Sequence, residues 1–281
     1  NTYTGLFLLY MLAPLAVMSG AAFNDNKLPS IVPWKGWTTR WFIEMIEDER
    51  MMIAFANTLW VAAAVALISV VIGTAAAILI NSVSGRLRTA LYGMMISTIL
   101  IPGVVIGIST MIMWTKLGNA IGTDFILFKP GLHLSVLGQV SYIAAMVMLL
   151  VLARLQSFDA GLEEAALDLG ASHAQVMRRI LLPHLYPAIG AGAAVAFFQS
   201  IENFNVTQFT RGGADTLTVY VFSKVRSGIT PTINALAFLL ICITLVLAVV
   251  YELNRRRRAR AEAARQAQAR RAEAEEGIGV V

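Results

Sequence analysis

The chain has 281 residues, of which 57% are hydrophobic and 14% are charged, and its mean hydropathy is +0.69. Soluble domains of this length are less apolar and carry more charge, so the composition excludes a soluble globular protein and predicts an all-α integral membrane protein. The formal net charge is +5, and the one cysteine, Cys242, lies in an apolar run, which excludes a disulfide framework and a metal site built from cysteines.

Six apolar segments are each long enough to cross a bilayer, which takes about 20 residues of helix. They lie at about residues 5–23, 53–80, 89–115, 132–153, 186–209 and 232–253. The sequence therefore predicts a polytopic protein with six transmembrane helices in a transmembrane domain over residues 1–253, followed by a basic, helix-prone tail over 254–281. Because the chain begins at Asn1 and not at a methionine, we expect some N-terminal residues to be missing, and no cleavable signal peptide is read.

The loop between the first two segments, residues 24–52, is rich in tryptophan, a residue type that favours the membrane interface. Trp34, Trp37 and Trp41 all lie in it, and Trp37 and Trp41 are separated by one helical turn. The pattern predicts an amphipathic helix over residues 38–50. Such a helix can lie on the membrane surface or pack against the bundle, and the sequence does not choose between the two.

The third segment contains helix-breaking and small residues. Pro102 lies in its middle, where a proline kinks a helix. Gly103 and Gly107 follow at the GxxxG spacing, which permits close approach of two helix backbones. We expect a kink at Pro102, and the glycines serve either a hinge near a gate or plain helix packing.

A polar stretch over residues 157–187 separates the fourth and fifth segments and is read as two short helices joined by a tight turn. Asp159 is placed to cap the first helix, and Gly170 is placed where a helix ends in a left-handed residue. Ser172 begins a capping box for the second helix, which Pro183 is expected to stop.

Seven residues of this stretch form a spaced motif: Glu164, Ala165, Ala166, Gly170, Ile180, Leu182 and Pro183. The motif resembles the EAA loop of permease subunits of binding-protein-dependent ABC importers. The resemblance implies the type I ABC importer fold, in which this loop forms a cytoplasmic coupling helix that docks on an ATPase. A helix with a small-residue face flanked by charge suits docking in a groove, although an ordinary helical hairpin between two spans remains the alternative.

The fifth segment carries a polar cluster, in which Gln199, Glu202 and Asn203 point to nearly one side at helical spacing. An ionisable residue inside a span is costly and is by default a candidate functional site. A carboxylate with neighbouring amides and aromatic rings can receive a cation, so these three residues are the candidate substrate pathway. The alternative is that Glu202 ends the span and pairs with a basic loop residue.

Further sequence details resemble the second permease subunit of spermidine/putrescine-type importers. They are Phe23-Asn24-Asp25, the LEEAALDLGAS core of the docking loop, and the stretch TLTVYVFSKVRSGITPTINALAFLL that ends at residue 240. The resemblance implies a polyamine such as spermidine or putrescine as the solute. Members of that subgroup often have adjacent acids in the fifth span, whereas Glu202 is followed here by Asn203, which admits a singly charged or zwitterionic amine.

The resemblance also implies the partners: a second permease, identical or different, two ATP-binding subunits and an extracytoplasmic solute-binding protein. No cofactor is then expected in this chain, since ATP and Mg²⁺ belong to the ATPase. It places the chain in the bacterial inner membrane, in contact with lipid, with both termini cytoplasmic. The distribution of Lys and Arg supports that orientation only when the tail after residue 254 is counted, because the outer loops are otherwise the more basic.

Other function classes lack their motifs. The sequence has no GxxxxGK[ST], HExxH or GxSxG pattern, so the chain is not expected to be an enzyme, and its three histidines have no metal-site spacing. An ion-coupled secondary transporter is the remaining rival, but it would need several intramembrane charges. The arginine-rich tail is read as a solvated extension in preference to a binding site for nucleic acid or acidic lipid.

Overall fold

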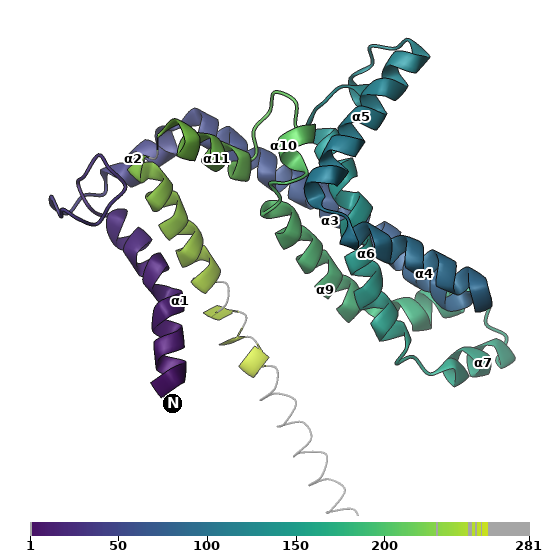
Figure 1. Ribbon diagram of the computed structural model, residues 1–281. Coiled ribbons are helices and arrows are strands. Elements are labelled where there is room, and N and C mark those ends of the chain that lie inside the picture. Colours follow the sequence, from purple (N-terminus) through teal and green to yellow (C-terminus); the bar gives the residue numbers. More distant parts are fainter. Residues whose placement is uncertain (1, 229, 247–248, 251, 254, 258–281) are drawn as a thin grey trace, which may run out of the picture. The chain divides into compact units, whose positions relative to one another are not determined.

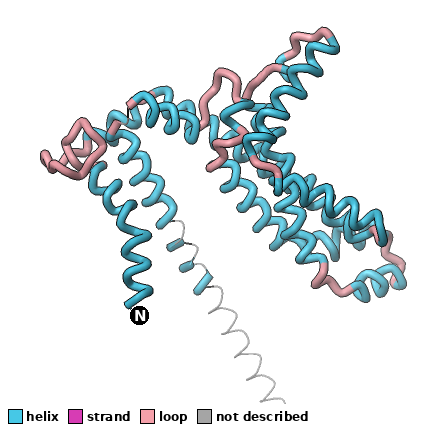
Figure 2. The backbone as a smooth tube through the Cα atoms, in the orientation of Figure 1, coloured by secondary structure: helices cyan, strands magenta, loops and turns pink. Residues whose placement is uncertain are grey.

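The structure is a computed structural model that describes residues 2–228, 230–246, 249–250, 252–253 and 255–257. Across these residues the regular structure is helical, with one isolated antiparallel bridge between Asn24 and Trp37 (Figures 1 and 2). The chain forms two compact units, Asn1–Glu47 with Gly228–Val281, and Asp48–Ser227. The tail predicted over 254–281 lies almost wholly outside the described residues.

The first unit contains α1 (Thr2–Ala21), α2 (Arg40–Glu47) and an apolar helix over Pro231–Val246. α2 is shorter than the predicted helix over 38–50. The reason is local: the Asp48 carboxylate accepts the backbone N–H of Met51 and so starts a new helix directly after α2. Trp41 and Met45, one turn apart, are the buried residues of α2.

The second unit begins with one long helix, α3 (Glu49–Ser82), and continues with shorter ones. These are α4 (Gly85–Leu100), α5 (Gly103–Ile121), the 3₁₀ turn η1 (Ile126–Phe128), α6 (Leu132–Leu155), α7 (Ala160–Asp168), α8 (His173–Val176), the π-helical turn η2 (Met177–Leu181), α9 (Leu182–Ile201), α10 (Thr207–Thr210) and α11 (Leu217–Ser227). α3, α6 and α9 pack side by side and form the core of this unit (Figure 1).

Small residues bring the core helices together. A Cβ atom added at Gly73 of α3 would lie 2.6 Å from the carbonyl oxygen of Ala144 in α6, and one added at Gly192 of α9 would lie 3.0 Å from Val147 Cγ1. Lipid tails are as apolar as leucine, so helices in a bilayer associate through close packing and not through the hydrophobic effect. These glycines permit the contact that holds α3, α6 and α9 together.

The third predicted segment, 89–115, is two helices in the structure. α4 ends at Leu100, Ile101 adopts an extended conformation with ψ 129°, and Pro102 is the N-cap of α5. Proline has no N–H to donate to the preceding turn, and its ring disfavours a helical conformation at the residue before it. The interruption predicted at Pro102 is therefore confirmed, and it is a full break.

Five described helices are long and apolar enough to cross a membrane: Thr2–Ala21, Glu49–Ser82, Gly103–Ile121, Leu132–Leu155 and the continuous run His173–Ile201. They correspond to the first five predicted segments, with shifted ends. The sixth, 232–253, corresponds to the shorter apolar helix Pro231–Val246, beyond which the structure describes only some residues. The helical, multi-pass architecture expected from the sequence is confirmed.

Candidate functional site

The fifth predicted span stops earlier than its apolar composition suggests. α9 ends at Ile201, and the chain turns through residues 202–206 before the short helix α10. Asn203 causes the turn: its N–H bonds to the Ser200 carbonyl at 3.2 Å, and its side-chain oxygen accepts the N–H of Val206 at 3.1 Å. An asparagine side chain that bonds to the nearby backbone in this way competes with helix hydrogen bonds.

A buried glutamine of α6 bridges the two sides of this turn. Gln139 is fully buried, accepts the Ser200 hydroxyl at 2.6 Å and donates to the Thr207 hydroxyl at 2.9 Å. One turn earlier on α6, Ser135 lies 2.9 Å from the Thr210 hydroxyl. One side-chain amide thus joins the end of α9 to the start of α10, and its oxygen and nitrogen are both satisfied.

Tyr142, on the next turn of α6, completes the cluster. The Asn203 side-chain amide donates to its hydroxyl at 2.5 Å, and Thr218 donates to the Asn203 carbonyl at 3.3 Å. We call Ser135, Gln139, Tyr142, Ser200, Asn203, Thr207 and Thr210 the polar cluster. It joins α6, α9 and α10 at the point where a span is interrupted.

α5 lies against the same turn through its two glycines. A Cβ at Gly107 would lie 2.9 Å from the Val206 carbonyl oxygen, and a Cβ at Gly103 would lie 3.1 Å from Asn205 Cβ. The GxxxG spacing therefore serves close packing, which was one of its two interpretations. The other interpretation, a hinge near a gate, stays a prediction.

The structure separates the three predicted pathway residues. Asn203 is buried in the polar cluster, Gln199 is half-buried on α9, and Glu202 is exposed at the C-cap of α9. Among the described residues Glu202 has no ion-pair partner, so the structural ion pair that was its alternative interpretation finds no support there. A free carboxylate thus lies beside a satisfied polar cluster.

Sequence reasoning missed the residues of the cluster on α6. Ser135, Gln139 and Tyr142 recur at intervals of four and three, which places them on one face of a helix. Thr207 and Thr210 recur at an interval of three. A search for polar residues at helical spacing within apolar segments, extended to neutral side chains, would have found both sets.

The predicted coupling loop folds largely as expected. Asp159 caps α7 by accepting the N–H of Gly161 at 2.9 Å, Gly170 adopts a left-handed conformation with φ +84°, and Ser172 forms a capping box with Gln175. α7 is a surface helix on which Leu162 is 53% exposed, and Leu169 directly after it is 90% exposed. It presents apolar side chains with no covering element among the described residues.

The expected end of the second loop helix at Pro183 is wrong. α8 continues through the π turn η2 into α9, and Pro183 lies in the first turn of α9. The Leu182 N–H bonds to the Met177 carbonyl, five residues back. The helix therefore changes from α-type to π-type hydrogen bonds just before the proline. The π turn lets the helical run pass the proline, which has no N–H to donate to the preceding turn.

The other motif residues differ in exposure. Glu164 and Ala165 are exposed and Ala166 is half-buried, while Ile180 and Leu182 are half-buried. Arg154, at the end of α6, donates to the His184 carbonyl at 3.2 Å and so joins the two ends of the loop. The loop is therefore tied to two core helices while its first helix remains accessible.

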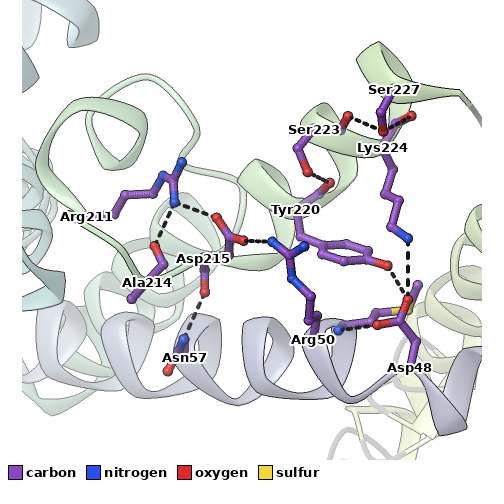
Figure 3. Close-up of polar contacts among 11 residues, drawn as sticks. Asp48, Arg50, Asn57, Arg211, Ala214, Asp215, Tyr220, Ser223, Lys224 and Ser227 are labelled. Carbon is purple, nitrogen blue, oxygen red and sulfur yellow. Dashed lines mark hydrogen bonds and ion pairs between the residues drawn. The ribbon is translucent and has the colours of Figure 1, made fainter.

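A second polar group fastens the segment after α10 to the start of α3 (Figure 3). Asp215 pairs with Arg211 at 2.5 Å and with Arg50 at 3.3 Å, and its carbonyl accepts from Asn57 at 2.9 Å. Asp48 accepts the Tyr220 hydroxyl at 2.5 Å and lies 3.7 Å from the Lys224 ammonium. We call the group around Asp48 and Asp215 the α3–α11 clasp.

The clasp shifts the titration of two groups. Burial raises the pKa of the Asp48 carboxyl, but the hydrogen bonds from Tyr220 and the Met51 N–H, together with the charge of Lys224, outweigh burial and hold that pKa below its usual value. Burial and the adjacent Asp48 carboxylate raise the pKa of Tyr220 far above its ordinary value. At neutral pH the clasp therefore contains an ionised aspartate and a neutral tyrosine.

Residues 69–260 match the family described as "Binding-protein-dependent transport system inner membrane component". The Putrescine transport system permease protein PotI of Escherichia coli (strain K12) is 35% identical over 235 residues, which cover 83% of this chain and 82% of that protein. The Spermidine/putrescine transport system permease protein PotC of the same strain is 28% identical over 245 residues, covering 87% and 89%.

Solved structures show the same fold. A bacterial ABC transporter involved in the import of the acidic polysaccharide alginate contains a chain that matches with a TM-score of 0.71 at 20% identity, over 88% of this chain and 90% of that one. The inward-facing MetNI methionine ABC transporter matches with a TM-score of 0.52 at 18% identity, over 71% and 93%. The fold is that of type I ABC importer permeases.

Proposed function

Because the chain belongs to the family of binding-protein-dependent transport system inner membrane components, we propose that it is the permease subunit through which a polyamine such as putrescine or spermidine enters the cell. The observation that carries the proposal is the 35% identity to a putrescine permease over more than four-fifths of both chains. The alginate and methionine transporters support the fold alone, because their sequences have diverged much further.

The substrate pathway is proposed to pass the interrupted end of α9. Glu202 supplies a free carboxylate there, which attracts an alkylammonium group. Asn203, the next residue, is buried in the polar cluster and fixes the turn at the end of α9, and Gln199 lies half-buried on α9. Glu202 is exposed and has no ion-pair partner among the described residues, which leaves it available to a passing cation and supports this role.

A zwitterionic or singly charged amine is the second candidate solute. It is favoured by one observation: Glu202 is followed by Asn203, whose side chain is engaged with Tyr142 and the Val206 N–H. One free carboxylate balances one ammonium group, whereas putrescine has two.

Energy for transport is proposed to come from two separate ATP-binding subunits, which hold ATP and Mg²⁺, so that this chain needs no cofactor. α7 would dock on such a subunit, with Glu164, Ala165 and Ala166 at the contact and Gly170 setting the turn behind it. Ile180, Leu182 and Pro183 would transmit the motion into α9, since they lie in the continuous helical run. The exposed apolar side chains at α7 support a docking role.

Two further partners are proposed, and the family description supports the dependence on a binding protein. A second permease subunit would complete the pathway, and an extracytoplasmic solute-binding protein would deliver the solute. The coupling loop must then face the cytoplasm, and both chain termini with it, which puts the α3–α11 clasp on the outer side.

Uptake in cells tests the proposal. Deleting the gene for this chain in its host should abolish energy-dependent accumulation of radiolabelled putrescine or spermidine at low external concentration. A plasmid copy of the gene should restore it. Uptake of a labelled amino acid by an unrelated carrier is the control. If the deletion leaves polyamine uptake unchanged but abolishes uptake of a zwitterionic or singly charged amine, that amine is the solute and the polyamine assignment is wrong.

A further inference from the structure

Residues 22–39 directly follow α1 and form an ordered loop, which we call the Asn24 loop. Asn24 is fully buried, and its side chain donates to the carbonyls of Ser30 at 2.8 Å and Pro33 at 3.0 Å while accepting the N–H of Lys35 at 2.8 Å. A single side-chain amide thereby fixes the course of the loop, which is irregular but not free to change shape.

Three tryptophans of this region have different environments. Trp41 is 5% exposed, and its indole N–H donates to the Asn24 carbonyl at 2.8 Å. Trp34 and Trp37 are 43% and 79% exposed, and their rings meet edge to face at 5.1 Å. Within the described chain neither indole N–H of this pair has a hydrogen-bond partner. Trp41 is therefore a structural residue, whereas Trp34 and Trp37 are directed outwards.

The position of the pair relative to the membrane is fixed by hydrogen bonds. α1 is an apolar helix that ends at Ala21, and the chain then continues with the polar residues Asn24, Asp25 and Asn26. Polar residues are costly in the hydrocarbon core, so the C-terminal end of α1 lies at a membrane surface. Trp37 pairs with Asn24 three residues after that end, and the Thr38 N–H bonds to the Phe23 carbonyl at 2.9 Å. The Trp37 ring also lies 5.8 Å from the Phe23 ring, so it cannot move far from the end of the span.

Charge beside the pair suits the headgroup layer. Lys27 and Lys35 are exposed, and neither forms an ion pair with any residue that the structure describes, whereas Arg40 is bound by Asp25 at 2.8 Å. Two indoles with free N–H groups beside free ammonium groups match the zone where acyl chains meet ester carbonyls and phosphates.

We propose that the Asn24 loop is a membrane-interface anchor: Trp34 and Trp37 insert into the ester and headgroup layer at the C-terminal end of α1, and Lys27 and Lys35 contact lipid phosphates. The occupant of this surface is phospholipid. The loop thereby holds the end of α1 at one depth, and α2, which is joined to it through Trp41, lies at the same level. The amphipathic helix expected at the membrane surface is thus secured by the loop that precedes it.

Quenching of tryptophan fluorescence by brominated lipid tests the anchor. The full chain, assembled with its partner subunits, is reconstituted in phosphatidylethanolamine/phosphatidylglycerol vesicles in which part of the lipid is brominated near the headgroup or near the acyl terminus. The emission of Trp34 and Trp37 is obtained by subtracting the spectrum of the variant W34F/W37F. We expect headgroup-proximal bromine to remove about half of this emission and terminal bromine clearly less, as for interfacial indoles. The variant W60F is the matched control, because Trp60 lies on α3, outside the loop, and its replacement should leave the quenching of the pair unchanged.

A spin label at Leu28→Cys, in a Cys242→Ser background, supplies a second measurement that leaves both tryptophans in place. Leu28 is 67% exposed on the same loop. Its label should relax with oxygen more than with a water-soluble nickel complex. If the pair is quenched by aqueous iodide and not by brominated lipid, the loop is solvated and the proposal is wrong. Protection from both quenchers would assign the surface to a protein partner, which also overturns it.

Discussion

At the residue scale, the distinction between Glu202 and Asn203 is central. The two are neighbours in sequence, yet the Asn203 side chain is bonded to Tyr142 and to the Val206 N–H, whereas Glu202 is exposed and has no ion-pair partner among the described residues. The turn after α9 buries the Asn203 side chain and leaves Glu202 exposed. Because Asn203 ends α9 with a turn, Glu202 lies exposed at the end of the helix and not inside an apolar span, where a carboxylate would need a partner.

Replacing Glu202 by Gln should weaken transport of a cation while leaving the fold intact. The change keeps size and hydrogen bonding but removes a charge worth about 1–2 kcal/mol to an ammonium ion in a partly solvated site, so uptake at low solute concentration should fall about tenfold. Uptake and melting temperature are measured on the same purified complex. Glu47→Gln, at an exposed acid of α2, is the control. A lowered melting temperature with normal uptake would assign Glu202 a structural role.

Gln139 is expected to act on stability. In Gln139→Leu the hydroxyls of Ser200 and Thr207 lose their shared partner inside an apolar environment, which should cost about 1 kcal/mol and lower the melting temperature. Ser141→Ala on the same helix is the matched control, because that hydroxyl only donates to the Gly138 carbonyl of its own helix. Equal melting temperatures for the two variants would show that the bridge across the turn is unimportant.

At the element scale, the clasp decides how α11 is held to α3, and it makes that contact pH-sensitive. The pKa of Asp48 is lowered in the folded protein. Its stabilisation is therefore present above the ordinary carboxyl pKa and is lost as pH falls through the folded pKa. The melting temperature of the wild type should exceed that of Asp48→Asn at neutral pH, and the difference should vanish in acid.

A second aspartate provides the control for that prediction. Asp124 is 99% exposed, and its one ion pair among the described residues is with Lys129, at 3.1 Å. Asp124→Asn should follow the wild type at every pH, because an exposed ion pair contributes little. If the difference between wild type and Asp48→Asn is the same at all pH values, the titration of Asp48 does not stabilise the clasp.

Gly170→Val tests the coupling loop as an element. Gly170 has φ +84° and open space around it, so the cost is backbone strain of about 1–2 kcal/mol and not a clash. The turn should shift and misplace α7, so that the complex still assembles but loses solute-stimulated ATP hydrolysis. Gly190→Ala also enters open space, in a helical conformation, and should behave like the wild type. Normal stimulated hydrolysis in Gly170→Val would refute the role of this loop.

At the scale of the whole molecule, the sequence predicts features that depend on neighbouring residues. The composition predicts a membrane protein, and Pro102 predicts the interruption of the third segment. The helix caps predicted at Asp159 and Ser172 also form. Family membership also excludes the ion-coupled secondary transporter that the sequence left open.

Features set by distant contacts could not be predicted in the same way. The early end of α9 depends on Asn203 bonding to Tyr142, 61 residues away, and on Gln139 bridging the turn. The helix continues past Pro183 through a π turn, which the local sequence pattern does not predict. The roles of Trp34 and Trp41 differ because Asn24 folds the loop back on itself. Each case needs a partner that is far away in the chain.

The most direct test of the central claim is uptake by the assembled transporter in proteoliposomes. The chain is purified with the proposed partner permease, ATPase and solute-binding protein, and labelled putrescine, spermidine and a zwitterionic amine are offered with ATP inside. We predict ATP-dependent accumulation of a polyamine that stops when the binding protein is omitted and falls about tenfold in Glu202→Gln. Accumulation without ATP, or ATP-driven uptake of the zwitterion alone, would contradict the assignment of this chain as a polyamine permease.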